Sequence, residues 1–159
     1  MHIIDKITKY LGYFTAFILV VLVLLVVYDA SLRYMFSSGS IALQELEWHL
    51  FDVIILFGIS YTLKYNAHVR VDIFYSQFCD KTKRIINIIS SVFFILPFSI
   101  LIIYISIDFV LLSFEQNEVS SNPGGLEYRY IIKSILPLSF VFLILQTISQ
   151  VKLDWESIK

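Results

Sequence analysis

The amino-acid sequence predicts an all-α membrane protein with four transmembrane helices and a short amphipathic helix in the cytoplasmic interface between the second and third. Composition is the first observation behind this fold class. Of the 159 residues, 58% are hydrophobic, and the mean hydropathy of the chain is +0.79. Soluble domains average closer to half apolar residues, so this excess indicates a bilayer environment rather than a large core. The second observation is that four separate segments could cross a hydrocarbon layer, which takes roughly 20 apolar residues in a helix. Each span is expected to be helical, because an open strand cannot satisfy its backbone in lipid.

The predicted spans lie at about residues 11–32, 45–64, 85–114 and 131–151. The apolar run of the first is longer than that of a signal peptide, and no small-residue cleavage site follows it, so we expect an uncleaved anchor. The third is long enough to cross with tilt, and Pro97 is expected to kink it. Without an internal repeat or a low-complexity segment, the sequence predicts a single domain over residues 1–159.

The distribution of the twelve Lys and Arg residues predicts the orientation. Only Arg33, Arg129 and Lys133 lie on one side of the predicted spans. The other nine precede the first span, follow the fourth, or lie between the second and third. By the positive-inside rule, both termini and the middle loop are expected in the cytoplasm.

The middle loop carries a helical pattern of its own. Apolar residues recur there at i, i+3, i+4 and i+7, at Val71, Phe74, Tyr75 and Phe78. This stripe predicts a short helix at about residues 71–83 that lies in the cytoplasmic interface, with its cations among the lipid headgroups. The alternative is that these residues extend the third span as one helix.

The second span has polar residues at both ends and no Asp, Glu, His, Lys or Arg between Val53 and Leu63. The first polar group, here named the first collar, contains Gln44, Glu45, Glu47, Trp48, His49 and Asp52. The second collar contains His68, Arg70 and Asp72. On a helix, Glu45, His49 and Asp52 share one face, because they are spaced i, i+4 and i+7.

Three kinds of site compete for the first collar. Its acids and histidine are possible metal ligands, but the set is small and has no supporting ligand elsewhere. A proton or ion relay through Asp52 would need polar residues further along the span, and none follow. Interface chemistry is favoured, in which these groups contact lipid headgroups or another subunit. In the second collar, Arg70 could hold a lipid phosphate or a partner carboxylate.

Composition excludes several other classes of protein. A net charge of -1 and a pI near 6.3 argue against a nucleic-acid partner. The single cysteine, Cys79, excludes a disulfide framework and a thiolate metal cage. His49 and His68 lie 19 residues apart on the sequence and so near opposite faces of the membrane, which does not fit a haem. We therefore expect no enzyme, no cofactor and no metal.

The sequence resembles the small integral-membrane subunit of tripartite ATP-independent periplasmic (TRAP) transporters, the DctQ family. The motifs that carry the resemblance are residues 43–51 (LQELEWHLF), Gly58, residues 68–72 (HVRVD), Pro123-Gly124-Gly125-Leu126, Arg129, Lys133 and Pro137. Many members have two adjacent glutamates where this chain has Gln44-Glu45.

The resemblance implies a subunit of the bacterial inner membrane that has no substrate site of its own. In this family a periplasmic solute-binding protein (DctP-like) captures an organic acid, and a large permease (DctM-like) imports it with sodium. The small subunit is expected to pack against and brace that permease among the membrane lipids. The loop containing Gly124 and Gly125, with Arg129, is expected to touch the binding protein. The alternative is a self-sufficient four-helix transporter acting as a homodimer, although such proteins use a carboxylate in the first helix, which is apolar here from Leu11 to Tyr28.

Overall fold

The structure is a computed structural model that describes residues 2–65, 67, 75 and 78–158. Its elements are α1 (His2–Phe36), α2 (Ile41–Lys64), α4 (Asp80–Ser90), the π-helical turn η1 (Ser91–Ile95), α5 (Leu96–Glu115) and α6 (Arg129–Glu156). Because α4, η1 and α5 are continuous, the chain has four helices long and apolar enough to cross a membrane, within the part that is described. The predicted all-α class and the four spans are confirmed.

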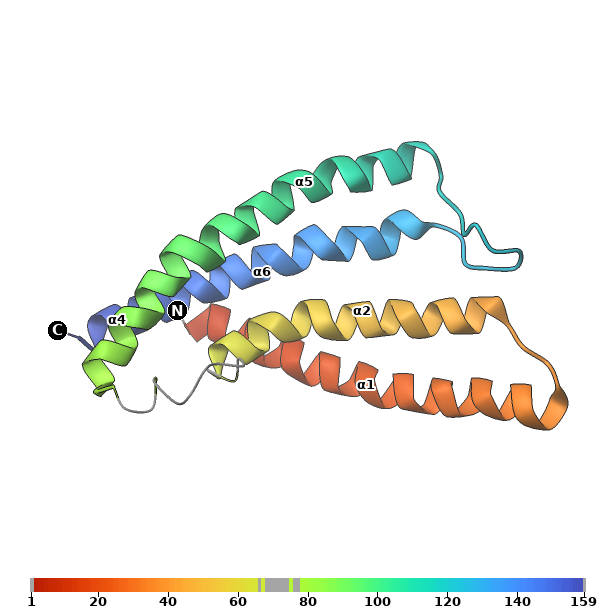
Figure 1. Cartoon of the computed structure of the whole chain (residues 1–159), viewed down its shortest axis with the longest axis horizontal. Coiled ribbons are helices and arrows are strands. Elements are labelled where there is room, and N and C mark those ends of the chain that lie inside the picture. Colours follow the sequence, from red (N-terminus) through yellow and green to blue (C-terminus); the bar gives the residue numbers. More distant parts are fainter. Residues whose placement is uncertain (1, 66, 68–74, 76–77, 159) are drawn as a thin grey trace.

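The four spans lie side by side in a flattened arrangement (Figure 1). Their order across the layer is α1, α2, α6, α5, with α1 packed along α2, α2 against α6, and α6 against α5. Both termini lie at one end of the layer, here named the terminal end. The loops that join α1 to α2 and α5 to α6 lie at the other, here named the loop end (Figure 1).

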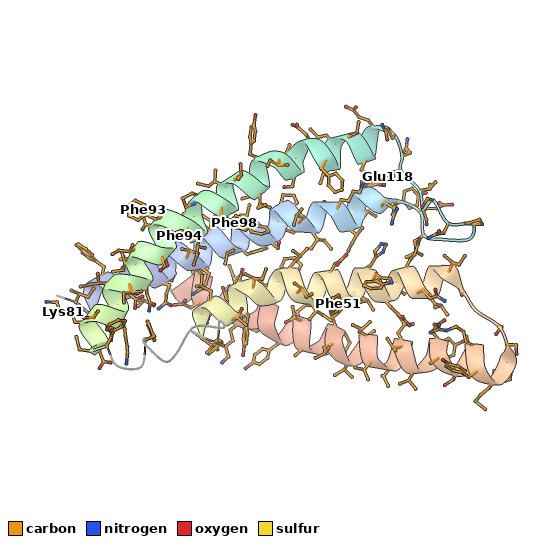
Figure 2. The ribbon with its side chains drawn as sticks, in the orientation of Figure 1. Phe51, Lys81, Phe93, Phe94, Phe98 and Glu118 are labelled. Carbon is orange, nitrogen blue, oxygen red and sulfur yellow. The ribbon has the colours of Figure 1, made fainter. Side chains whose placement is uncertain are left out.

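A layer of helices buries few apolar side chains. The core cluster consists of Leu63, Phe140 and Leu143, with partly buried neighbours from α2, α5 and α6 around it. Large aromatic side chains remain on the surface instead, among them Phe93 and Phe94, which are 70% and 71% exposed (Figure 2). In a bilayer such residues face acyl chains or another subunit instead of water. Their position outside the core therefore costs no free energy there.

The helix pairs approach closely where the side chains are small. On α5, Ser99, Ser106 and Ser113 recur every seven residues and are all buried, because this face packs against α6. On α1, Gly12 leaves room for the ring of Tyr61 on α2, which a Cβ atom would strike. Small residues are the usual means of close packing between membrane helices, where burying apolar surface gains little.

A buried polar cluster joins three helices near the terminal end. The Thr8 hydroxyl donates to Gln146 Oε1 at 2.7 Å, and both residues are fully enclosed. The Lys64 ammonium donates to the backbone carbonyl of Asp5. These bonds connect α1 with α6 and α1 with α2, so they determine the relative register of the three helices.

The third span differs from the sequence prediction at its first residues, near the terminal end. The interfacial helix predicted at about residues 71–83 is not confirmed: residues 71–74 and 76–77 lie outside the described residues, and Asp80 begins α4. Pro97 lies in the first turn of α5, directly after η1. Since proline has no N–H to donate to residue 93, the Leu96 N–H bonds five residues back, to Ser91. The long helix curves along its length (Figure 1).

Candidate functional site

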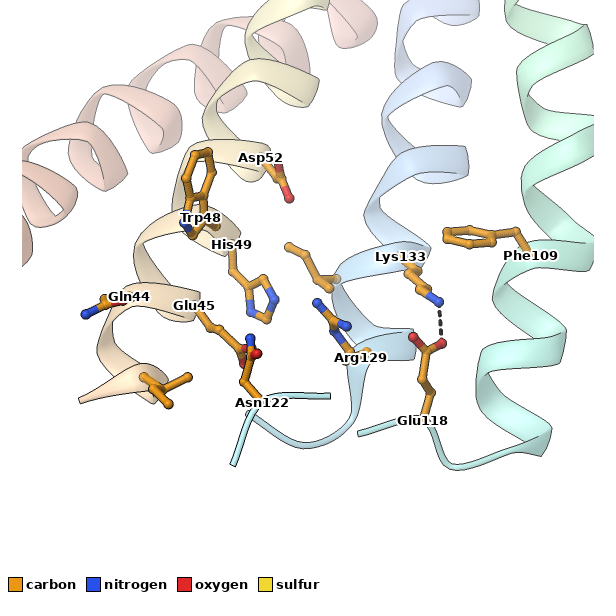
Figure 3. Close-up of a pocket in the computed structure, with 12 residues that line it drawn as sticks. Gln44, Glu45, Trp48, His49, Asp52, Phe109, Glu118, Asn122, Arg129 and Lys133 are labelled. Carbon is orange, nitrogen blue, oxygen red and sulfur yellow. Dashed lines mark hydrogen bonds and ion pairs between the residues drawn. The ribbon is translucent and has the colours of Figure 1, made fainter. Parts of the chain in front are cut away.

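A pocket of about 660 Å³ lies at the loop end between α2 and α6. Five of the six residues of the first collar line it: Gln44, Glu45, Trp48, His49 and Asp52. The opposite wall brings Arg129 and Lys133 from α6, Phe109 from α5, and Glu118 and Asn122 from the connecting loop (Figure 3). We call this the loop-end pocket.

The helical spacing of the first collar explains its position. Glu45, His49 and Asp52 share one face of α2, as predicted, and that face turns toward α6. The helix begins at Ile41, where the Ser40 hydroxyl accepts a hydrogen bond from the Leu43 N–H at 3.5 Å. The start of α2 therefore places all three side chains opposite the loop that joins α5 to α6.

Glu45 is buried and bound entirely within the chain. Its carboxylate accepts hydrogen bonds from the Ser120 hydroxyl, from Asn122 Nδ2 at 3.3 Å, and from the Leu126 N–H at 2.7 Å. All three donors belong to the α5–α6 loop. One carboxylate on α2 thus holds a loop about 80 residues further along the chain.

The two loop glycines make this contact possible. Residues 122–125 form a turn in which the Gly125 N–H donates to the Asn122 carbonyl at 3.0 Å. Gly124 has φ +79°, which glycine adopts without strain, and Pro123 before it gives the sequence of a type II turn. A Cβ atom on Gly125 would lie 2.7 Å from Glu45 Oε2 and would collide with Ser120. The glycines therefore allow the loop to fold onto Glu45.

An ion pair forms the second connection between the loop and the helices. The Lys133 ammonium donates to Glu118 Oε2, and it lies 4.1 Å from the centroid of the Phe109 ring (Figure 3). This bond holds the pKa of the Glu118 carboxyl below its ordinary value. Lys133 thus has both a carboxylate and an aromatic ring as partners.

Three charged or titratable side chains of the pocket have no such partner. Within the described residues, the side chains of His49, Asp52 and Arg129 form neither a hydrogen bond nor an ion pair, although the Arg129 charge acts at longer range on the carboxylates of Glu45 and Glu118. Asp52 is exposed, and Arg129 and His49 are partly exposed. The loop-end pocket thus offers a carboxylate, a guanidinium and an imidazole to a molecule from outside the chain.

The remaining predicted residues lie elsewhere. Glu47 does not line the loop-end pocket, and its Oε1 is buried without a hydrogen bond. It lies two residues from Glu45 and so on the other side of α2. Asp29 on α1 is completely buried and pairs with Arg33 at 2.8 Å. The second collar, His68, Arg70 and Asp72, lies outside the described residues.

The described residues contain no group of three or more His, Cys, Asp or Glu side chains close enough to hold a metal ion. The first collar instead holds the α5–α6 loop through Glu45, and most of its other residues line a polar pocket beside that loop. Sequence reasoning missed Ser120 and Asn122 as partners of Glu45, since nothing in a short polar loop indicates which distant carboxylate it contacts.

The fold and this site define a small multi-pass membrane protein with a charged pocket toward its loop end, while the rest of its second helix, from Val53 to Leu63, has no Asp, Glu, His, Lys or Arg. Comparison with known proteins agrees. The family model for tripartite ATP-independent periplasmic transporters, DctQ component, matches residues 22–157. A Haemophilus influenzae protein, provisionally named a TRAP transporter small permease protein, is 26% identical over 145 residues, covering 91% of this chain and 87% of that one.

The chain belongs to the DctQ family and is a small permease subunit of a TRAP transporter. Its family is one of transporters, and it is a multi-pass protein of the inner membrane. As a component of a tripartite system, a protein of this family works with a large permease and a binding protein.

Proposed function

We propose that this subunit packs against the large permease and braces it in the bilayer, while the permease carries an organic acid inward with sodium. The chain itself has no substrate site and no catalytic activity in this proposal. The observation that carries it is the flattened arrangement of α1, α2, α6 and α5, with large apolar side chains on its outer surfaces. Such a layer offers a wide apolar surface to a neighbouring membrane protein.

The location of the charges supports the same proposal. A transporter needs polar groups or interrupted helices near the middle of the membrane, where substrate and ions bind. Here α2 has no Asp, Glu, His, Lys or Arg from Val53 to Leu63, and α1 has none from Leu11 to Tyr28. The charges of the loop-end pocket are therefore suited to assembly rather than to a transport path.

The loop end is proposed to face the periplasm and both termini the cytoplasm, as the distribution of Lys and Arg predicts. In this orientation the α5–α6 loop, with Gly124, Gly125 and Arg129, lies where a binding protein would dock. Glu45 contributes indirectly, because it holds that loop in place. The second collar, with His68, Arg70 and Asp72, is proposed to anchor the cytoplasmic corner of α2 to lipid or permease.

The test is reconstitution of the transporter with and without this subunit. Permease and binding protein are placed in liposomes with a sodium gradient, and uptake of candidate organic acids is measured. Uptake is expected only when this chain is present, and the chain should co-purify with a tagged permease. Sodium-driven uptake by this chain alone would refute the proposal and favour the self-sufficient homodimer.

A double variant tests whether the first collar takes part in assembly. Glu45→Gln combined with Asp52→Asn is expected to lower complex yield or uptake, whereas Asp108→Asn, an exposed acid of α5 outside the pocket, should leave both unchanged. If the double variant changes neither quantity, the first collar has no part in assembly.

A further inference from the structure

The loop-end pocket continues toward the middle of the membrane as a second, smaller cavity. This cavity measures about 300 Å³ and shares Asp52, Phe109, Ile132 and Lys133 with the pocket above it. Its remaining lining is apolar: Ile55, Leu56 and Leu136. A charged chamber thus opens directly onto an apolar chamber, and both lie between α2 and α6. That combination matches an amphiphile.

Asp52 indicates that the ligand carries a positive group. It lies twelve residues from Lys64 at the opposite end of α2, or about 18 Å along the helix axis, within a hydrocarbon layer of about 30 Å. A carboxylate at this depth is costly unless a cation or a strong donor meets it. Lys133, one of the two cations on the opposite wall, is already bound to Glu118. Arg129 lines the same pocket but forms no ion pair with Asp52, so within the described residues the Asp52 carboxylate is open to a positive group from another molecule.

The same chamber also offers donors for a negative group. Arg129 projects into it from α6, and its guanidinium has the planar fork of N–H groups that suits a phosphate. His49 lines the chamber beside it (Figure 3). A ligand with a phosphate and an ammonium joined by a short link would satisfy Arg129 and Asp52 together.

We propose that the loop-end pocket binds one phospholipid with an ethanolamine headgroup. The phosphate lies against Arg129 and His49, the ammonium donates to Asp52, and an acyl chain occupies the apolar chamber between Ile55 and Leu136. Ethanolamine is favoured over choline because its ammonium has N–H donors for the carboxylate. It is favoured over glycerol because that headgroup carries no cation. The site lies within one chain, so this inference does not depend on the proposed bracing of the permease.

The test measures which lipids remain on the purified full-length chain. Protein extracted from its membrane in mild detergent is analysed by native mass spectrometry, and its lipids are extracted and quantified by headgroup. The wild type is expected to retain one ethanolamine lipid in excess of the membrane average. Asp52→Asn and Arg129→Gln should each reduce this retention about tenfold, which corresponds to about 1.4 kcal/mol. Asp108→Asn is the matched control and should retain the lipid.

A second pair of variants tests the apolar chamber without changing any charge. Ile55→Trp fills the chamber and should lower lipid retention. Ile100→Trp places the same ring on an exposed position of α5 and should not. Unchanged melting temperatures exclude unfolding as the cause, and retention equal to the wild type in both Asp52→Asn and Ile55→Trp refutes the site.

Competition separates a lipid from a soluble phosphate compound. Glycerophosphoethanolamine carries the same headgroup without acyl chains, and an excess of it should not displace the bound lipid. Displacement by this compound would mean that the headgroup alone is bound, and the lipid proposal would be wrong. The proposal is also wrong if the wild type retains lipids only in the proportions of the membrane. It is equally wrong if Asp52→Asn no longer co-purifies with the permease but keeps its bound lipid unchanged.

Discussion

Glu45 is the residue at which sequence reasoning and the tertiary structure differ most. Its position near the start of an apolar helix predicts a polar partner, and lipid or another subunit was the expected source. The structure supplies that partner from the chain itself, through Ser120, Asn122 and Leu126. A buried carboxylate with three donors positions a loop firmly, because release would leave a charge without partners.

The first prediction concerns this anchor. Glu45→Ala removes all three acceptor contacts, so the N–H of Leu126 should exchange its hydrogen with solvent at least about tenfold faster, as expected for an opened loop. Hydrogen exchange followed by mass spectrometry of a peptide covering residues 118–128 measures this change. Glu127→Ala is the control, since it alters an exposed acid of the same loop. Equal exchange in both variants would show that Glu45 does not hold the loop.

The second prediction follows from the lowered pKa of Glu118. A carboxyl whose pKa is lower in the folded state stabilises the fold above its ordinary pKa of 4.5, and this contribution is lost as the pH falls through the lowered value. The contact with Lys133 should thus be unchanged from pH 7 to about 5 and break only below 4.5. Trp48 fluorescence in a Trp155→Phe background reports the pocket. The change in fluorescence that disappears in Glu118→Gln belongs to this ion pair. If that change occurs above pH 5, the assignment is wrong.

At the scale of elements, the α5–α6 and α1–α2 pairs depend on small residues without charged side chains. Ser99, Ser106 and Ser113 form the face of α5 that meets α6. Their seven-residue recurrence was visible in the sequence and could have identified this face. Serine in an apolar span is both polar and small, and here its small size lets α5 approach α6 closely.

The third prediction compares two glycines. Gly12→Ala places a methyl group against the Tyr61 ring, so it should destabilise the α1–α2 pair by about 1–3 kcal/mol, the usual cost of overpacking. Gly58→Ala meets nothing within 4 Å and should be neutral or stabilise by up to about 1 kcal/mol. Thermal unfolding in detergent ranks the two variants. If Gly12→Ala is as stable as Gly58→Ala, helix propensity, and not the contact with Tyr61, governs position 12.

The start of the third span was harder to predict than its existence. Asp80 begins α4, and η1 then carries the helix on toward Pro97. An amphipathic pattern fits an interfacial helix and the exposed first turns of a long span equally well. The choice depends on whether the backbone turns at the membrane surface, which side-chain periodicity does not encode.

At the scale of the whole molecule, the helices form a layer whose two central members, α2 and α6, carry the loop-end pocket between them. The flanking helices α1 and α5 leave large apolar surfaces exposed. A layer of this kind has little core of its own, which fits a subunit that is completed by lipid and by a larger partner.

The fourth prediction tests the orientation of this layer. Cys79 is the single cysteine of the sequence and is exposed, and a hydrogen bond with Thr82 lowers the pKa of its thiol, which favours labelling. A membrane-impermeant maleimide should label it in inverted vesicles but not in intact spheroplasts, because the middle loop is expected in the cytoplasm. Ser121→Cys in a Cys79→Ser background should label in the opposite pattern. Labelling of Cys79 in spheroplasts would reverse the proposed topology.

The sequence by itself determined the class of the protein, its four spans and the shared face of Glu45, His49 and Asp52. These follow from composition and from the 3.6-residue period of the helix, both of which are local properties. Only the tertiary structure decided that the helices are ordered α1, α2, α6, α5, that Glu45 binds the α5–α6 loop, and that Asp52 faces Arg129 across a pocket. The last two join residues about 75 or more positions apart, and contacts at that separation depend on how helices pack, which no local pattern specifies.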